Sequence, residues 1–203
     1  MAPLSIGAIL MAQVYAGGST SGANYNPAVT FGVFLRRAFA PWEYQNAFPL
    51  TKALGYVVAQ MLGAAGAGAL VLYATAIKPG YPSPSVSRSL LAVPIEAIGT
   101  FFLVFVVLQT ATSAKTKGNS FYGLAIGFTV TSMACTLGGL SGGAFNPAVG
   151  LLGLTTAGDI MDLVTAYNWV YAAGPLLGGL LAALFYRLVM VDEFVPPTGR
   201  SMV

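Results

Sequence analysis

A nine-residue pattern occurs twice in this sequence, and both copies carry an asparagine followed by proline and alanine. Residues 21–29 read SGANYNPAV and residues 141–149 read SGGAFNPAV, so six of nine positions are identical at an offset of 120 residues. Asparagine is a favoured helix N-cap. Proline suits the first helical position because it has no backbone N–H that would need a partner there. Two helix starts that meet inside a membrane present amide donors to a passing neutral oxygen, while their positive dipole ends oppose protons and cations. This chemistry suits a pore for small uncharged molecules. The predicted pore-centre residues are Asn26, Pro27, Ala28, Asn146, Pro147 and Ala148.

The composition excludes most soluble and catalytic classes of protein. The 203 residues include nine basic and six acidic side chains, and 56% are apolar. These charges are too few to solvate a globular surface, and the scattered basic residues form no patch for nucleic acid. With no histidine and a single cysteine, the chain offers no metal cluster and no nucleophile–base pair. We therefore expect a membrane protein that is not an enzyme and needs no metal or cofactor.

The apolar segments predict an all-α membrane protein. Four segments approach the roughly 20 residues that cross a bilayer, and a shorter segment at the N-terminus is also interpreted as a span. Two further apolar segments are too short to cross and are interpreted as half-helices, each opened by an Asn-Pro-Ala box. The five predicted spans are residues 3–16, 50–74, 90–111, 121–140 and 167–190, and the half-helices are residues 27–34 and 147–154.

Three spans separate the two copies of the pattern, so the copies enter the membrane from opposite faces and the repeat is inverted. The chain is then one transmembrane channel domain. Residues 1–74 form a first repeat with its box at 26–28, residues 90–191 a second with its box at 146–148, and residues 192–203 a polar tail without a functional signal.

The distribution of positive charge predicts the orientation. Seven basic residues gather on one side of the predicted topology and two on the other, so we expect a cytoplasmic C-terminus and an N-terminus on the opposite side. The seven are Arg36, Arg37, Lys52, Lys115, Lys117, Arg187 and Arg200; the other side holds Lys78 and Arg88, together with Asp159 and Asp162.

The two boxes, SGANYNPAVTFG and SGGAFNPAVGLLG, resemble those of the aquaporin, or major intrinsic protein, family. The resemblance extends to residues 56–64 (YVVAQMLGA), 96–100 (EAIGT) and 174–179 (GPLLGG), which are similar to the family's third, fourth and sixth helices. It implies an hourglass pore in each protomer, a homotetramer in a lipid bilayer, and passive transport of water or small neutral solutes.

The resemblance also assigns a selectivity filter, and there the sequence departs from strict water channels. Those channels carry an arginine directly after the second box, where this chain has Val149. The other matching positions are Gly143 and Ala134, which are also small and uncharged. Such a constriction is wider and less hydrated, so we expect permissive transport, as in some plant tonoplast-type channels. Typical glycerol facilitators have an aspartate where this chain has Gly150, so a dedicated glycerol channel is not favoured.

The family has six spans and this sequence has five, because nothing matches the family's first helix. Without that helix the first half-helix and the carbonyls of its loop are expected to face lipid, at a cost of several kcal/mol per unsatisfied group. Three explanations stay open. The helix is missing only from this sequence, another chain supplies it, or the protein is a non-conducting structural subunit of a larger membrane assembly.

Glu96 is the one acidic residue within a predicted span. An intramembrane carboxylate suggests proton relay, but no histidine or second acid lies near it in sequence. The resemblance favours structural support, with Glu96 accepting hydrogen bonds from backbone N–H groups of a re-entrant loop.

Overall fold

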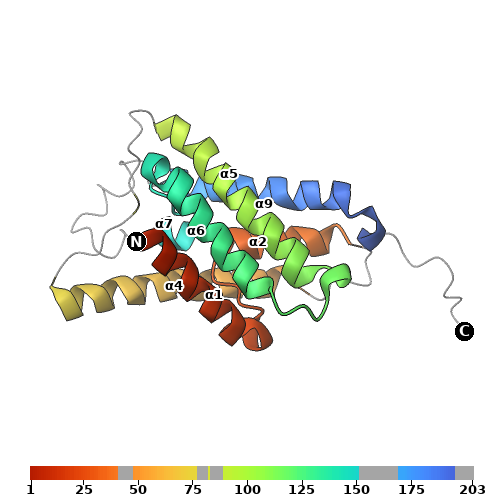
Figure 1. Ribbon diagram of the computed structural model, residues 1–203, viewed down its shortest axis with the longest axis horizontal. Coiled ribbons are helices and arrows are strands. Elements are labelled where there is room, and N and C mark those ends of the chain that lie inside the picture. The colour runs from red at the N-terminus through yellow and green to blue at the C-terminus, as the bar shows by residue number, and fades with distance from the viewer. Residues whose placement is uncertain (41–47, 77–81, 83–88, 151–168, 195–203) are drawn as a thin grey trace, which may run out of the picture.

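The computed structural model describes residues 1–40, 48–76, 82, 89–150 and 169–194, and within these ranges the regular elements are all helical. Figure 1 shows the long helices side by side in a bundle, with α4 along one edge. The elements are α1 (Ala2–Ser21), α2 (Pro27–Ala38), α4 (Leu50–Thr75), α5 (Ser89–Val107), the π-helical η1 (Leu108–Thr112), the 3-10 turn η2 (Ala114–Thr116), α6 (Tyr122–Ser141), α7 (Pro147–Gly150), α9 (Val170–Val189) and the 3-10 turn η4 (Val191–Phe194).

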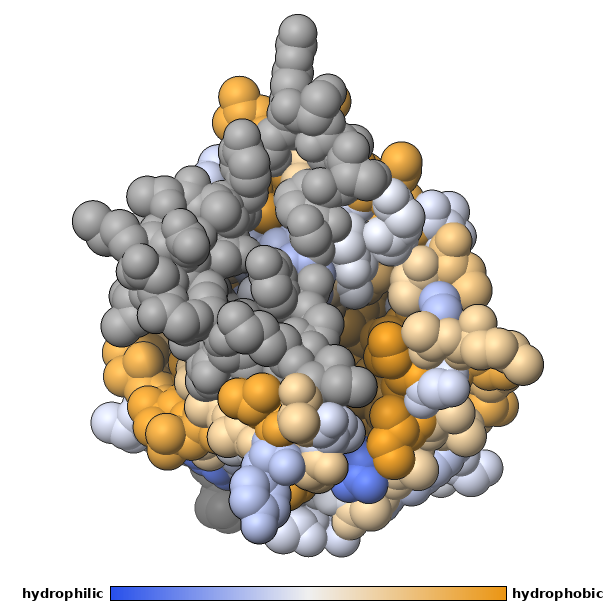
Figure 2. Space-filling view, turned by 90° about the vertical axis from the view of Figure 1, so that its left-hand side faces the viewer, coloured by the Kyte–Doolittle hydropathy of each residue, from blue (hydrophilic) through white to orange (hydrophobic). Residues whose placement is uncertain are grey.

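The predicted all-α membrane fold is confirmed. In the described part of the chain, four helices are long and apolar enough to cross a membrane, namely Leu50–Thr75, Leu90–Thr112, Tyr122–Ser141 and Val170–Val189. Helix α1 has 20 residues, more than the predicted residues 3–16, but it is not among these four by hydropathy. Apolar side chains lie around much of the periphery visible in Figure 2, as expected for contact with lipid.

The first half-helix is longer than predicted. The first was expected to end at residue 34 but continues to Ala38, for 12 residues. A helix of that length spans roughly 18 Å, about half of a membrane. The second begins at Pro147 as expected and is described to Gly150, and the rest of its predicted range lies outside the described residues.

The two repeats coincide in their element boundaries. Helices α1 and α6 end at Ser21 and Ser141, and the half-helices begin at Pro27 and Pro147, so the 120-residue offset of the sequence is kept. The helices α1 and α6 meet at Gly7 and Gly127, which occupy equivalent positions in the repeat. A Cβ added to either glycine would lie 2.5 Å from the carbonyl oxygen of the other. The two backbones therefore touch on the pseudo-symmetry axis, as small residues allow in membranes.

Helices α4 and α9 both contain several glycines but differ in packing. A Cβ at Gly174 of α9 would lie 2.7 Å from the Glu96 Cβ on α5, and one at Gly178 would overlap the Ala97 carbonyl. Glycines of α9 thus allow its backbone to approach α5 closely. Gly63 and Gly66 of α4 make no such contacts, because no heavy atom lies within 4 Å of a Cβ built on either. Only 11% of the most apolar stretch of α4 is buried, against 39% in α9.

This contrast predicts opposite effects for one substitution at two glycines. Gly178→Ala should lower the free energy of unfolding by about 1–3 kcal/mol, because the methyl group overlaps the α5 backbone. Gly63→Ala should leave it unchanged or raise it by up to ~1 kcal/mol, since alanine favours helix and meets open space. Unfolding of the two variants in detergent, followed by circular dichroism, measures both. Equal destabilisation would contradict the packing difference.

Candidate functional site

The asparagine at the start of each half-helix donates a hydrogen bond to the loop before the other half-helix, and these two bonds hold the half-helices together. Asn26 Nδ2 donates to the carbonyl of Phe145 at 2.8 Å, and Asn146 Nδ2 donates to the carbonyl of Tyr25 at 3.1 Å. Each asparagine also caps its own half-helix, because its Oδ1 accepts the backbone N–H two residues later at 2.9 Å. The amides are therefore fixed in orientation, and each keeps one N–H that these bonds do not use.

The chain reverses into each half-helix through a left-handed backbone position. Helices α1 and α6 are capped at their C-terminal ends by Gly22 (φ 69°) and Gly142 (φ 97°), whose N–H groups donate to the carbonyls of Gly18 and Gly138. Glycine adopts this conformation without the penalty that a Cβ brings. These caps return the chain toward the centre of the bundle, where Asn26 and Asn146 meet.

The second loop rests on the predicted support residue, Glu96, which is fully buried. Its carboxylate accepts hydrogen bonds from Ser141 Oγ at 2.6 Å, Ala144 N at 3.1 Å and Phe145 N at 2.7 Å. A further bond runs from the Tyr171 hydroxyl to the Ser141 carbonyl. Phe145, whose carbonyl accepts from Asn26, is thus anchored on its other side by Glu96.

The first loop is supported by α4, contrary to the expectation that its carbonyls face lipid. Tyr56 donates to the Ser21 carbonyl at 2.9 Å, as Tyr171 does to Ser141 in the other repeat. Gln60 Nε2 donates to the carbonyl of Asn24 at 2.7 Å and to Thr30 Oγ1 at 2.8 Å. With the Tyr25 carbonyl bonded to Asn146, three loop carbonyls have partners, so that expectation is wrong for them.

No residue in the described part of the chain supports the first loop as Glu96 supports the second. The side-chain oxygens Asn24 Oδ1 and Gln60 Oε1 are buried there without a hydrogen-bond partner. Buried polar atoms are normally paired. The support of the first loop is therefore less complete than that of the second.

A cavity of about 1370 Å³ runs past both asparagines. Asn26 and Asn146 line it, as do the predicted filter residues Ala134, Gly143 and Val149. Val149 is 41% exposed, so its side chain faces open space. The remaining box residues, Pro27, Ala28, Pro147 and Ala148, are buried at the helix starts and do not line the cavity. The structure thus brings the asparagines and filter residues together around one space.

Sequence reasoning missed the wall that the first repeat contributes. Ile6 and Ile9 of α1 line the cavity, and so do Val14, Ala23 and Val29. The last three are offset by 120 residues from Ala134, Gly143 and Val149. The repeat itself was the signal, because pseudo-symmetric positions of an inverted repeat border the same axis.

Basic residues predicted to lie on the cytoplasmic side gather at one end of the bundle. Four of them line the cavity there, while Arg187 donates to the Phe39 carbonyl at 2.9 Å and Lys115 pairs with Asp192 at 3.1 Å. The four are Arg36, Arg37, Lys52 and Lys117. Lys78, Arg88, Asp159, Asp162 and Arg200 lie outside the described residues. The described basic residues of the predicted cytoplasmic side thus lie near this mouth of the cavity, and the orientation itself stays a prediction.

The start of the predicted polar tail is part of this mouth. Asp192 and Glu193 lie in the turn η4, and the Glu193 side chain is only 6% exposed. The predicted polar tail of residues 192–203 thus begins in an ordered turn with the Glu193 side chain directed inward, and residues 195–203 lie outside the described part. No spacing in the sequence signals that this glutamate turns inward.

The described residues contain no group of three or more histidine, cysteine, aspartate or glutamate side chains placed to hold a metal ion. Among the described residues, the cavity lining combines amide, hydroxyl, aromatic and aliphatic side chains with a charged mouth.

The contacts of Glu96 predict a graded loss of stability. Glu96→Ala leaves three buried donors without an acceptor, and each costs about 1–3 kcal/mol. Glu96→Gln keeps one acceptor oxygen and should lose less. Unfolding in detergent ranks the variants, and amide hydrogen exchange at Ala144 and Phe145 reports on the loop. Unchanged protection of both amides in Glu96→Ala would rule out support by Glu96.

Comparison with known proteins agrees with this geometry. The family described as "Major intrinsic protein" matches residues 1–186. Aquaporin AqpM of Methanothermobacter marburgensis is 32% identical over 200 residues, covering 91% of this chain and 74% of that protein. A probable TIP-type aquaporin of Medicago truncatula is 33% identical over 189 residues, covering 91% and 69%. The X-ray structure of the aquaglyceroporin from Plasmodium falciparum shares the fold, with a TM-score of 0.74 and 24% identity over 94% of this chain and 82% of that one. This chain therefore belongs to the major intrinsic protein family of integral membrane channels for water or small solutes.

Proposed function

We propose that this chain forms a passive pore for water and small neutral solutes, with a constriction that admits solutes larger than water. The observation that carries the proposal is that Asn26 donates to the Phe145 carbonyl and Asn146 to the Tyr25 carbonyl, with both amides lining one cavity. Both amides are fixed, and each keeps one N–H to donate to a solute oxygen. The two half-helix N-termini add a positive potential that disfavours cations.

The permissive constriction is the finer part of the proposal. Val149, Gly143 and Ala134 border the cavity and offer no charge and little volume. An arginine at position 149 would narrow the path and donate hydrogen bonds, which favours water over urea or glycerol. Valine removes both effects. We therefore expect urea and glycerol to pass together with water.

Stopped-flow light scattering on proteoliposomes tests the pore itself. Wild-type protein should speed osmotic shrinkage above that of empty liposomes, and Asn146→Asp should lose this flux because it replaces the amide donor with a carboxylate. The control is equal incorporation and helicity of both proteins. Flux that persists in Asn146→Asp would contradict the role of the asparagine pair.

Val149→Arg tests the constriction separately. The added guanidinium should reduce urea and glycerol flux much more than water flux, since it narrows the path without closing it to the smallest solute. The ratio of the two permeabilities in the same proteoliposomes is the measurement. If both fluxes fall equally, or if neither changes, Val149 is not the filter residue.

We also propose that the first repeat is incomplete and that a further helix completes the wall beside α4. The open space at Gly63, the limited burial of α4 and the unpartnered oxygens of Asn24 and Gln60 all support a missing neighbour on that face. The same observations favour a second function, that of a non-conducting subunit within a larger assembly. Absence of flux from well-folded wild-type protein would favour that role over transport.

The Gly63 variant distinguishes a covered α4 from an open one. In this chain alone Gly63→Ala should be neutral, as argued above. In protein purified with a neighbouring helix, the same methyl group should destabilise, as at Gly178, because the two helices would approach closely. Thermal unfolding of the membrane-extracted protein measures this. A neutral Gly63→Ala in that preparation would contradict a helix packed on α4.

A further inference from the structure

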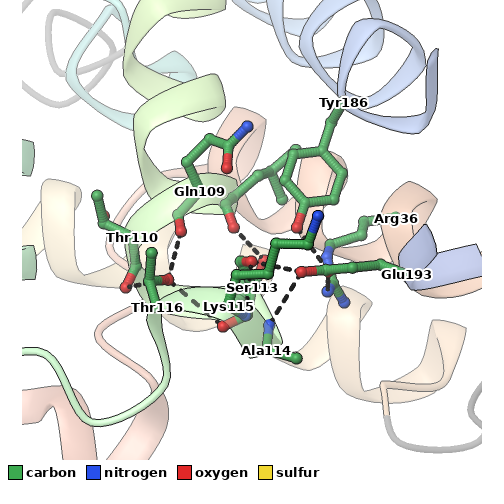
Figure 3. Close-up of polar contacts among 11 residues, drawn as sticks. Arg36, Gln109, Thr110, Ser113, Ala114, Lys115, Thr116, Tyr186 and Glu193 are labelled. Atoms are coloured by element: carbon green, nitrogen blue, oxygen red, sulfur yellow. Dashed lines mark hydrogen bonds and ion pairs between the residues drawn. The ribbon is translucent and has the colours of Figure 1, made fainter. Parts of the chain in front are cut away.

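One carboxylate, that of Glu193, connects three separate elements at the charged mouth (Figure 3). Its Oε1 accepts hydrogen bonds from Ser113 Oγ and from Ala114 N at 3.0 Å. Its Oε2 accepts from the Tyr186 hydroxyl at 2.7 Å and forms an ion pair with Arg36. The turn η4 thereby ties the last turns of α2 and α9 to the start of the connection between α5 and α6.

The elements joined by Glu193 border the same cavity as the two asparagines. Arg36, Ser113, Ala114 and Glu193 itself all line the cavity. Arg36 lies two residues before the end of α2, the half-helix that begins at the pore centre. A change in this cluster therefore alters the mouth of the pore directly.

Arg36 is the member of the cluster that most needs Glu193. Its side chain is 8% exposed, and its guanidinium carbon lies 5.2 Å from the centre of the Tyr186 ring. Its Nε has no hydrogen-bond partner. Removing the partner of a buried ion pair leaves an uncompensated charge at high cost. Without Glu193, the Arg36 guanidinium gains by turning toward water, and the water-accessible space it borders is the cavity.

Neighbouring charges on the same turn provide an internal contrast. Asp192 pairs with Lys115 at 3.1 Å, but these side chains are 82% and 57% exposed. An exposed pair of this kind contributes little to stability.

The contacts of Glu193 also determine its charge. Burial by itself would raise the pKa of Glu193, but Ser113, Tyr186 and Arg36 together hold the pKa below its ordinary value. Glu193 is thus ionised at neutral pH.

We propose that Glu193 is a positioning residue that holds Arg36 and the α5–α6 connection against the wall of the mouth, and that loss of its charge lets Arg36 obstruct the pore. The obstruction rests on the proposed transport function. The restraint of the connection does not, because it depends only on the four contacts of the carboxylate.

The test compares Glu193→Gln with Asp192→Asn, a matched loss of one carboxylate charge on the same turn. In proteoliposomes, Glu193→Gln should lower water permeability several-fold, while Asp192→Asn should equal wild type. The double variant Glu193→Gln/Arg36→Gln should recover wild-type permeability, since the obstructing group is gone. Absence of recovery would show a merely structural role and overturn the proposal, as would an unchanged permeability in Glu193→Gln.

A second readout is independent of flux. Lys115 and Lys117 lie in the connection that Glu193 restrains, and trypsin cleaves after lysine only where the segment opens locally. Cleavage there should be faster in Glu193→Gln than in wild type, and unchanged in Asp192→Asn. Equal rates in Glu193→Gln and wild type would overturn the restraint even if wild-type protein conducts nothing.

Discussion

The fold depends on one constraint, the need to pair every backbone polar group that enters the membrane. Two loops and two half-helix starts lie in the interior of the bundle, where lipid offers no hydrogen bonds. Asn26 and Asn146 resolve this by capping their own helices and donating to each other's loops. The hydrogen bonds that pair the backbone therefore also fix the two amides that line the cavity.

The two repeats meet this constraint with different chemistry. In the second repeat a buried carboxylate, Glu96, receives three donors from its loop. In the first repeat Gln60 and Tyr56 of α4 donate to carbonyls instead, which leaves two amide oxygens unpartnered. The asymmetry coincides with the open face of α4. Support of a loop and packing of a helix are thus coupled, because in the second repeat α5 supplies both Glu96 and the surface on which α9 packs.

At the mouth near Arg36, a buried charged group must likewise be paired. A buried guanidinium needs a counter-charge, and the chain supplies it from the turn after α9 rather than from a neighbouring helix. The Glu193 carboxylate accepts hydrogen bonds both from the end of α9 and from the connection between α5 and α6. Parts of the chain up to 157 residues apart are thereby joined at one mouth of the cavity.

The sequence by itself determined the helices, the half-helix starts and the asparagine pair. Hydropathy and a repeat at a constant offset of 120 residues can be recognised without knowledge of the fold. The sequence also pointed to Val149, Gly143 and Ala134, but only through resemblance. Tertiary structure alone decided which small residues make contact, since Gly63 and Gly178 look alike in sequence yet only Gly178 has a neighbour. It likewise decided that Glu193 turns inward, since its four partners are brought together only by the folded bundle.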